Sequence, residues 1–169
     1  KSKKKKWENI FKGWNNKESN EILTLKQVPV FRDFQYSDFR ELENLMHKRE
    51  YKTGDYIFKN RAPGEGMYII VKGNVKITVG TRSKKENVFA NLTDGEFFGE
   101  LALFDDEPRS ANAIATENTQ LLGFFTQDLM TLQERNPVLG QKILFNLGGL
   151  LGERLRKTNS LLVKEQTKK

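Results

Sequence analysis

The sequence of 169 residues contains no cysteine, four prolines and a single histidine. Without cysteine the chain can form neither disulfides nor thiolate metal sites, and a reducing compartment suits it. We therefore expect a cytoplasmic protein that holds no metal. The single histidine, His47, has no second imidazole or thiol to complete a metal site. We interpret it as a polar residue near the end of a helix.

Long hydrophobic runs are also missing. No apolar stretch approaches the roughly 20 residues of a membrane-spanning helix, and the N-terminus has no signal-peptide core. Neither a Gly-x-x-x-x-Gly-Lys phosphate loop nor a nucleophile elbow occurs. The acidic residues 105–107 are adjacent in sequence, whereas acid–base catalysis needs groups on opposite sides of a bond. We therefore predict that the chain is not an enzyme and has no cofactor.

Positive charge is plentiful, but it is confined to the ends of the chain. Of the net charge of +7, residues 1–6 contribute +5 and residues 153–169 contribute +4, which leaves −2 for residues 7–152. A domain that reads nucleic acid normally carries a basic face on its folded surface. In addition, the ten residues after Asn159 are too few for a helix-turn-helix. We therefore expect no direct DNA binding by this chain.

The first lysines are followed by aromatic residues, and residues 1–20 form a basic lead-in. Four apolar side chains of this segment fall on one helical face: Trp7, Ile10, Phe11 and Trp14. Such a face can lie on an anionic membrane or dock on protein, in either case through residues 1–14. We favour docking, because Gly13 interrupts the short apolar stretch. Solvated termini that aid solubility are the simpler explanation of the charge itself.

Between residues 50 and 125 the pattern changes to short apolar segments separated by turn signals such as Gly54-Asp55 and Gly73-Asn74. Several short strands at this spacing are typical of an antiparallel jelly roll or barrel. We therefore predict an α+β fold that is mainly β. The expected strands are residues 56–58, 67–71, 75–79, 88–92, 111–115 and 121–125.

Helical patterns flank the strands. We predict helix over residues 21–48 with Ser37 as an N-cap, and a short helix over 126–135. A last helix begins at Asn136-Pro137, where proline suits the first turn. Its leucines recur at steps of three and four, which fits a two-stranded homodimer seam or a helix laid on the barrel, and we favour the dimer. These leucines are Leu144, Leu147, Leu151, Leu155 and Leu162, and Thr158 fills the step between the last two.

The chain therefore divides into three expected parts. Residues 1–20 are the lead-in, residues 21–136 are a helix plus a β-roll, and residues 137–169 are a lid or dimerisation helix.

The most informative segment is the run from Phe98 to Ala115. Gly99 lets the backbone approach a ligand closely, because glycine has no Cβ. Residues 101–103 can form one helical turn whose free N–H groups point at an anion. Arg109 offers a planar fork that suits phosphate oxygens, and Glu100 is a good acceptor for sugar hydroxyls. Taken alone, Glu100 and Arg109 could instead form an ordinary ion pair that fixes a loop.

This run resembles the phosphate-binding cassette of the cyclic nucleotide-binding domain family. The family pattern is Phe-Gly-Glu-Leu-Ala-Leu, a short loop, then Pro-Arg-(Ser/Thr/Ala)-Ala. Here residues 98–103 are FGELAL and residues 108–111 are PRSA, so no required position departs from the pattern. The resemblance extends upstream through Gly54-Asp55, residues 66–70 and residues 73–75, and covers roughly residues 28–160.

The resemblance implies a role for each residue of the cassette. Arg109 would neutralise the cyclic phosphate, with help from the Ser110 hydroxyl. Backbone N–H groups would share the same oxygens, and Glu100 with the Gly99 backbone would hold the ribose 2′-hydroxyl. The N–H groups belong to Leu101, Ala102, Leu103 and Ala111. In the family the base rests on barrel residues and on a lid helix, here Ile77 and Phe89 with Thr158 and Asn159.

We therefore expect a non-catalytic sensor that binds a cyclic nucleotide and transmits binding through the last helix. Ser110 permits a contact with guanine in cyclic GMP, but its hydroxyl can equally serve the phosphate of cyclic AMP, which we favour. Two alternatives stay open. One is a dimerisation or interaction module that keeps the fold without binding nucleotide, and the other is a membrane-surface adaptor that uses the lysine-rich N-terminus.

Overall fold

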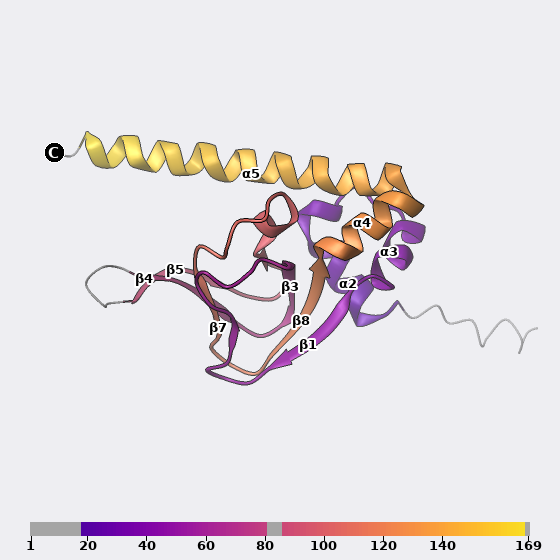
Figure 1. Ribbon diagram of the computed structural model, residues 1–169, viewed down its shortest axis with the longest axis horizontal. Coiled ribbons are helices and arrows are strands. Elements are labelled where there is room, and N and C mark those ends of the chain that lie inside the picture. Colours follow the sequence, from indigo (N-terminus) through magenta and orange to yellow (C-terminus); the bar gives the residue numbers. More distant parts are fainter. Residues whose placement is uncertain (1–17, 81–85, 168–169) are drawn as a thin grey trace, which may run out of the picture.

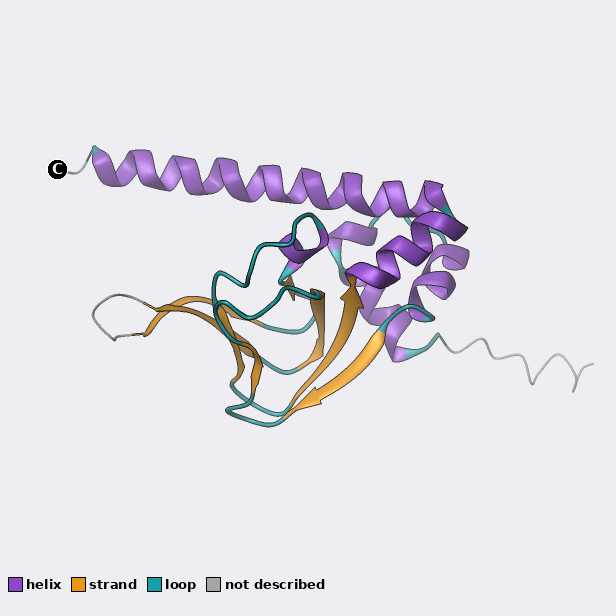
Figure 2. Ribbon diagram, in the orientation of Figure 1, coloured by secondary structure: helices purple, strands orange, loops and turns teal. Residues whose placement is uncertain are grey.

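The computed structural model describes residues 18–80 and 86–167. The expectations for the lead-in, including its amphipathic face and the membrane adaptor, concern residues 1–17 and lie outside this range. Within the described residues, two antiparallel sheets of four strands form a barrel-like roll, and helices pack on one side of it (Figures 1 and 2). The predicted mainly β jelly-roll fold with N-terminal and C-terminal helices is therefore confirmed.

Each sheet combines strands that are distant in sequence. The first sheet has the order β1-β8-β3-β6, and the second has the order β2-β7-β4-β5. In the first sheet the strands are β1 (His47–Tyr51), β8 (Thr119–Phe125), β3 (Gly66–Lys72) and β6 (Phe97–Phe98). In the second they are β2 (Tyr56–Phe58), β7 (Asn112–Ala115), β4 (Val75–Gly80) and β5 (Glu86–Leu92).

The central strand β3 is buried on both faces, which explains its unbroken apolar sequence. Side chains alternate along a strand, so neighbouring residues face opposite sides of the sheet. Met67 and Ile69 pack into the core beneath the helices. Tyr68 and Ile70 pack into the core between the two sheets. The two cores of the domain therefore share the backbone of this strand.

The helices are α2 (Asn20–Gln27), η1 (Pro29–Phe31), α3 (Tyr36–Glu43), η2 (Glu100–Leu103), α4 (Thr126–Arg135) and α5 (Pro137–Gln166). The predicted bounds of α4 and the start of α5 agree with the structure. Asn136 caps α5, because its Oδ1 accepts a hydrogen bond from the Leu139 N–H at 3.2 Å. Among the described residues, no helix combines the length and apolarity needed to cross a bilayer.

Two predictions about the N-terminal helices are wrong. The segment 21–48 is not one helical stretch, because Pro29 starts a short 3₁₀ turn after α2 and residue 47 already belongs to β1. Ser37 lies inside α3, whose N-cap is Gln35. The backbone N–H of Gln35 donates to the Asp38 carboxylate at 2.9 Å. The N-cap of α3 therefore lies two residues before the predicted serine cap at position 37.

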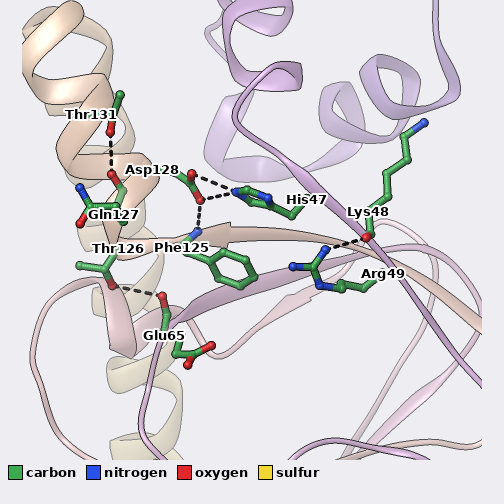
Figure 3. Close-up of polar contacts among 9 residues, drawn as sticks. All are labelled: His47, Lys48, Arg49, Glu65, Phe125, Thr126, Gln127, Asp128 and Thr131. Atoms are coloured by element: carbon green, nitrogen blue, oxygen red, sulfur yellow. Dashed lines mark hydrogen bonds and ion pairs between the residues drawn. The ribbon is translucent and has the colours of Figure 1, made fainter.

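His47 lies in β1 rather than near a helix end, and it joins the barrel to α4 (Figure 3). Its Nε2 is 3.0 Å from both carboxylate oxygens of Asp128, to which it donates because a carboxylate can only accept. The imidazole also stacks on Phe125, with ring centroids 4.9 Å apart. Asp128 in turn accepts a hydrogen bond of 2.8 Å from the Phe125 N–H at the start of α4.

Replacing Asp128 with alanine removes both of these bonds at once. We expect Asp128→Ala to lower the free energy of unfolding by about 1–2 kcal/mol, the usual cost of a lost helix cap. Urea unfolding followed by circular dichroism measures this change. Gln127→Ala is the matched control, because this neighbouring side chain is exposed. Equal free energies of unfolding for the two variants would show that the hydrogen bonds of Asp128 contribute nothing to stability.

Candidate functional site

The candidate site is built by the segment that connects β6 to β7. Gly99 follows β6 in a left-handed conformation, with φ of 76° and ψ of 13°, and the short helix η2 begins directly after it. The Ala102 N–H donates to the Gly99 carbonyl at 3.3 Å. Among the described residues, the backbone N–H groups of Glu100, Leu101 and Ala111 have no hydrogen-bond acceptor. These N–H groups are therefore available to bind a ligand.

Arg109 is the buried cation of the site, with 7% of its surface exposed. Its Nη1 donates to the Gly99 carbonyl at 2.9 Å and its Nη2 donates to the Gly66 carbonyl at 2.6 Å. The guanidinium carbon lies 4.1 Å from the ring centroid of Phe58, within the range of a cation–π contact. The Nε atom has no partner within the described part of the chain.

The electrostatics of Arg109 favour an anionic ligand. Burial lowers the pKa of Arg109, because an apolar environment disfavours the charged form. Among the described residues, no carboxylate oxygen lies within 4.0 Å of its guanidinium. The simple Glu100–Arg109 ion pair is therefore not formed. A buried guanidinium whose bonds go only to neutral carbonyls keeps its charge available for an anion.

Glu100 is equally buried, at 7% exposure, but its charge is compensated from α5. The Arg154 guanidinium donates to Glu100 Oε1. The same guanidinium lies 4.7 Å above the ring of Phe97. Arg154 therefore connects the last helix to the carboxylate that the sequence assigns to the ribose.

The other predicted phosphate residues surround this centre. Ala102 and Leu103 are buried, Leu101 is 53% exposed, Ser110 is exposed and Ala111 is half-buried. They lie on the same connection as Gly99 and Arg109. Their assignment to the phosphate stays a prediction.

The predicted base contacts lie outside the cassette segment, on strands β4 and β5 and on α5. Ile77 is half-buried and packs against the core between the sheets. Phe89 lies on the β4–β5 hairpin with 77% of its surface exposed. Thr158 and Asn159 are exposed on α5, and the Thr158 hydroxyl donates to the Arg154 carbonyl at 3.0 Å. Their contacts with the base also stay predictions.

Besides Arg154, three contributors to the site were not predicted from the sequence. Phe58 covers the Arg109 guanidinium, and the Gly66 carbonyl binds it. The loop at residues 61–62 fixes the Arg109 backbone, because the Arg61 N–H donates to the Arg109 carbonyl at 2.7 Å and the Arg109 N–H donates to the Ala62 carbonyl at 2.8 Å. Arg61 has a φ of 67°, which is rare for a residue other than glycine. That strained position directly beside Arg109 could have been found only from the structure.

A comparison with known protein families gives a match to the part of the chain that builds this site. The sequence profile described as the cyclic nucleotide-binding domain covers residues 48–136 of this chain. The match includes β1 to α4 and the whole cassette. The chain belongs to the cyclic nucleotide-binding domain family, whose members are regulatory binding modules.

Individual relatives agree with this assignment. The chain is 32% identical to the cyclic AMP receptor protein of Thermus thermophilus over 80% of its own length and 61% of that protein. It is 34% identical to human cGMP-dependent protein kinase 2 over 56% of this chain and 12% of the kinase. The chain therefore spans only part of the relatives that it matches.

Solved structures show the same fold. The Thermus thermophilus catabolite activator protein superposes with a TM-score of 0.72 at 32% identity, over 79% of this chain and 61% of that one. The N-terminal domain of a transcriptional regulator from Streptomyces coelicolor gives a TM-score of 0.71 at 30% identity, over 81% of this chain and 95% of that one.

Gly99 offers a direct test of the site's geometry. A Cβ at this position would lie 2.7 Å from Arg109 Nη1, whereas a Cβ at Gly54, whose φ is also positive at 91°, would meet nothing within 4 Å. Both alanine variants carry the cost of a left-handed residue, but only Gly99→Ala also displaces the buried guanidinium. We expect Gly99→Ala to be less stable than Gly54→Ala by about 1–3 kcal/mol in urea unfolding. Equal losses of stability in the two variants would mean that the Arg109 guanidinium does not lie against Gly99 as described.

Proposed function

We propose that this domain binds a 3′,5′-cyclic nucleotide, prefers cyclic AMP to cyclic GMP, and transmits binding through α5 without catalysing a reaction. The observation that carries the proposal is the buried Arg109 guanidinium without a neutralising carboxylate, next to the free N–H groups at the start of η2. A cyclic phosphate is compact and carries one negative charge, so it supplies the missing anion.

The nucleotide is bound by several groups that act on different atoms. The phosphate oxygens accept hydrogen bonds from the Arg109 fork and from the N–H groups of Leu101 and Ala111. The helix N-terminus at η2 adds a partial positive charge beside the same oxygens. The ribose 2′-hydroxyl donates to Glu100, one of whose oxygens is already held by Arg154. The ligand therefore contacts the barrel and lies beside the last helix at the same time.

The lengths of two matches support the preference for cyclic AMP. The cyclic AMP receptor protein aligns over 80% of this chain, whereas the human cGMP-dependent kinase aligns over 56%. Ser110, the residue suited to contact guanine, is exposed and can serve the phosphate instead. The cytoplasmic location and the limits of the three parts of the chain stay predictions.

Removal of the Arg109 charge tests the proposed phosphate contact. We expect Arg109→Leu to weaken nucleotide binding by more than about 100-fold, because a buried anion would have no counter-charge. Isothermal titration with cyclic AMP and cyclic GMP measures this loss, and the native protein should bind cyclic AMP more tightly. Arg40→Leu is the control, since Arg40 is exposed on α3. Undiminished affinity in a folded Arg109→Leu protein would refute the site.

We further propose that α5 pairs with α5 of a second copy. Two apolar side chains that lie on one face of the second half of the helix are exposed, Leu155 at 61% and Leu162 at 53%. Leu147, which the sequence placed on the same stripe, is instead buried in its own domain. The first part of α5 therefore lies on the domain, and the exposed face is left for a partner helix.

Introducing negative charges on this face tests the dimer. We expect the double variant Leu155→Glu and Leu162→Glu to sediment as a monomer, because burying two carboxylates in a helix pair is unfavourable. Leu161→Glu is the control. Leu161 is 54% exposed, but it lies six residues from Leu155, about 1.7 turns, and so on another face. Identical sedimentation of the native and double-variant proteins would exclude pairing through this face.

A further inference from the structure

A cavity of about 290 Å³ lies between α5 and the body of the domain. Its volume is at the lower end of the range that small-molecule pockets cover. No residue of the cassette, positions 98–111, lines it, so the function proposed above does not account for it. The lining residues are Pro29 of η1, Gly95, Glu96 and Phe97 from the segment before the cassette, and Leu150, Glu153, Arg154 and Lys157 of α5.

The cavity lies on the other side of the first sheet from Arg109. Phe97 and Phe98 are neighbours in β6, so their side chains face opposite sides of the sheet. Phe98 belongs to the core between the sheets and lies 5.8 Å from Phe58, the ring that covers Arg109. Phe97 belongs to the core beneath the helices and lines the cavity. The sheet therefore separates the cavity from the proposed phosphate site.

The wall of the cavity that faces α5 is fixed to the central strand β3. The Gly95 N–H donates to the Ile70 carbonyl at 2.8 Å, and the Ile70 N–H donates to the Glu96 carbonyl at 2.9 Å. The Glu96 carboxylate is also held, because its Oε2 accepts a hydrogen bond of 2.8 Å from the Thr93 N–H. This wall is therefore formed before any ligand arrives, as is usual for small-molecule sites.

One end of the cavity is apolar. Phe97 is 6% exposed, and Leu150 packs on the edge of the same core. Pro29 adds a third apolar surface. The Arg154 guanidinium lies 4.7 Å above the ring of Phe97 and closes this end from the side of α5. A ligand group that enters here would exchange water for hydrocarbon, which favours an apolar side chain.

The other end carries two charged groups of opposite sign. Glu153 and Lys157 lie one turn apart on α5, a spacing at which glutamate and lysine often pair. Within the described part of the chain, however, neither has an ion-pair partner within 4.0 Å. Arg154 is already bound to Glu100. The cavity therefore presents one available carboxylate and one available ammonium beside an apolar wall.

We propose that this cavity binds a free apolar α-amino acid. The α-carboxylate accepts hydrogen bonds from the Lys157 ammonium, and the α-ammonium donates to the Glu153 carboxylate. The side chain of the ligand lies against Phe97, Leu150 and Pro29. A ligand with one charge would be attracted by one of the two groups and repelled by the other, whereas a zwitterion satisfies both. The inference rests on the cavity and does not depend on the proposed function.

Binding of amino acids to the nucleotide-free protein tests the ligand class. L-leucine and L-phenylalanine are the probes, and calorimetry with ligand-observed NMR measures their affinity. Leucinamide lacks the carboxylate and 4-methylpentanoate lacks the ammonium, and we expect each to bind at least about tenfold more weakly than leucine. Equal binding of leucine and either analogue overturns the recognition of a zwitterion. Absence of binding of both amino acids at about 10 mM overturns the proposal.

Variants of the lining residues test the location. We expect Lys157→Met and Glu153→Gln each to weaken leucine binding by about tenfold or more, because one charge of the ligand loses its partner. Leu150→Trp fills the apolar end and should abolish binding. Lys164→Met and Glu165→Gln are the matched controls, since both residues lie on α5 beyond the cavity. Unchanged leucine affinity in the two charge variants, or in Leu150→Trp, overturns the site.

A titration with cyclic AMP keeps the two sites distinguishable. Failure of the native protein to bind cyclic AMP overturns the proposed function, while leucine binding still decides the cavity. We expect Leu150→Trp to keep the native affinity for cyclic AMP, because the first sheet lies between the cavity and Arg109. Loss of cyclic AMP binding in a folded Leu150→Trp protein would overturn the separation of the two sites.

Discussion

The site depends on one interaction, the pair of hydrogen bonds from the Arg109 guanidinium to the carbonyls of Gly66 and Gly99. These bonds connect the loop before β7 to the start of β3 and to the turn before η2. They also fix the guanidinium in a place that water hardly reaches. Because both acceptors are neutral carbonyls, these hydrogen bonds hold the guanidinium without neutralising its charge. The protein thus keeps a rigid cation in a poorly solvated site, where an electrostatic contact is stronger than in water.

The two charges of the cassette are kept apart. Glu100 and Arg109 have opposite charges and lie nine positions apart, yet the carboxylate is held by Arg154 from a distant helix. An ion pair between Glu100 and Arg109 would neutralise both groups and remove the electrostatic attraction for a ligand. With separate partners, the site offers an anion position and a hydroxyl acceptor side by side.

Much of the fold could be predicted from the sequence, because its signals are local. The buried run of β3, the turns at Gly54 and Gly73, and the helix 126–135 have clear local patterns. Strand β1 was missed because HKREY is a polar strand at the edge of its sheet, with its middle residues exposed. Strand β6 was missed because two residues are too few to show alternation.

The cassette could be predicted for the same reason, since its residues are close in sequence and match a known pattern. The partners of its charged groups could not. Phe58 and Gly66 reach Arg109 from other strands, and Arg154 reaches Glu100 across 54 positions. Such contacts arise from tertiary packing, and a single sequence contains no local signal for them. The structure also corrects Leu147, which a heptad-like step placed on the exposed seam although the domain buries it.

The double burial of β3 has a consequence for how the domain unfolds. Met67 and Ile69 belong to the helical core, while Tyr68 and Ile70 belong to the core between the sheets. If either core unfolded, β3 would also be lost from the other core. The helices and the roll should therefore be lost in a single cooperative transition, with no stable state in which the roll persists alone. A fragment that contains only the roll would expose one full face of its central strand to water, and such a surface promotes aggregation.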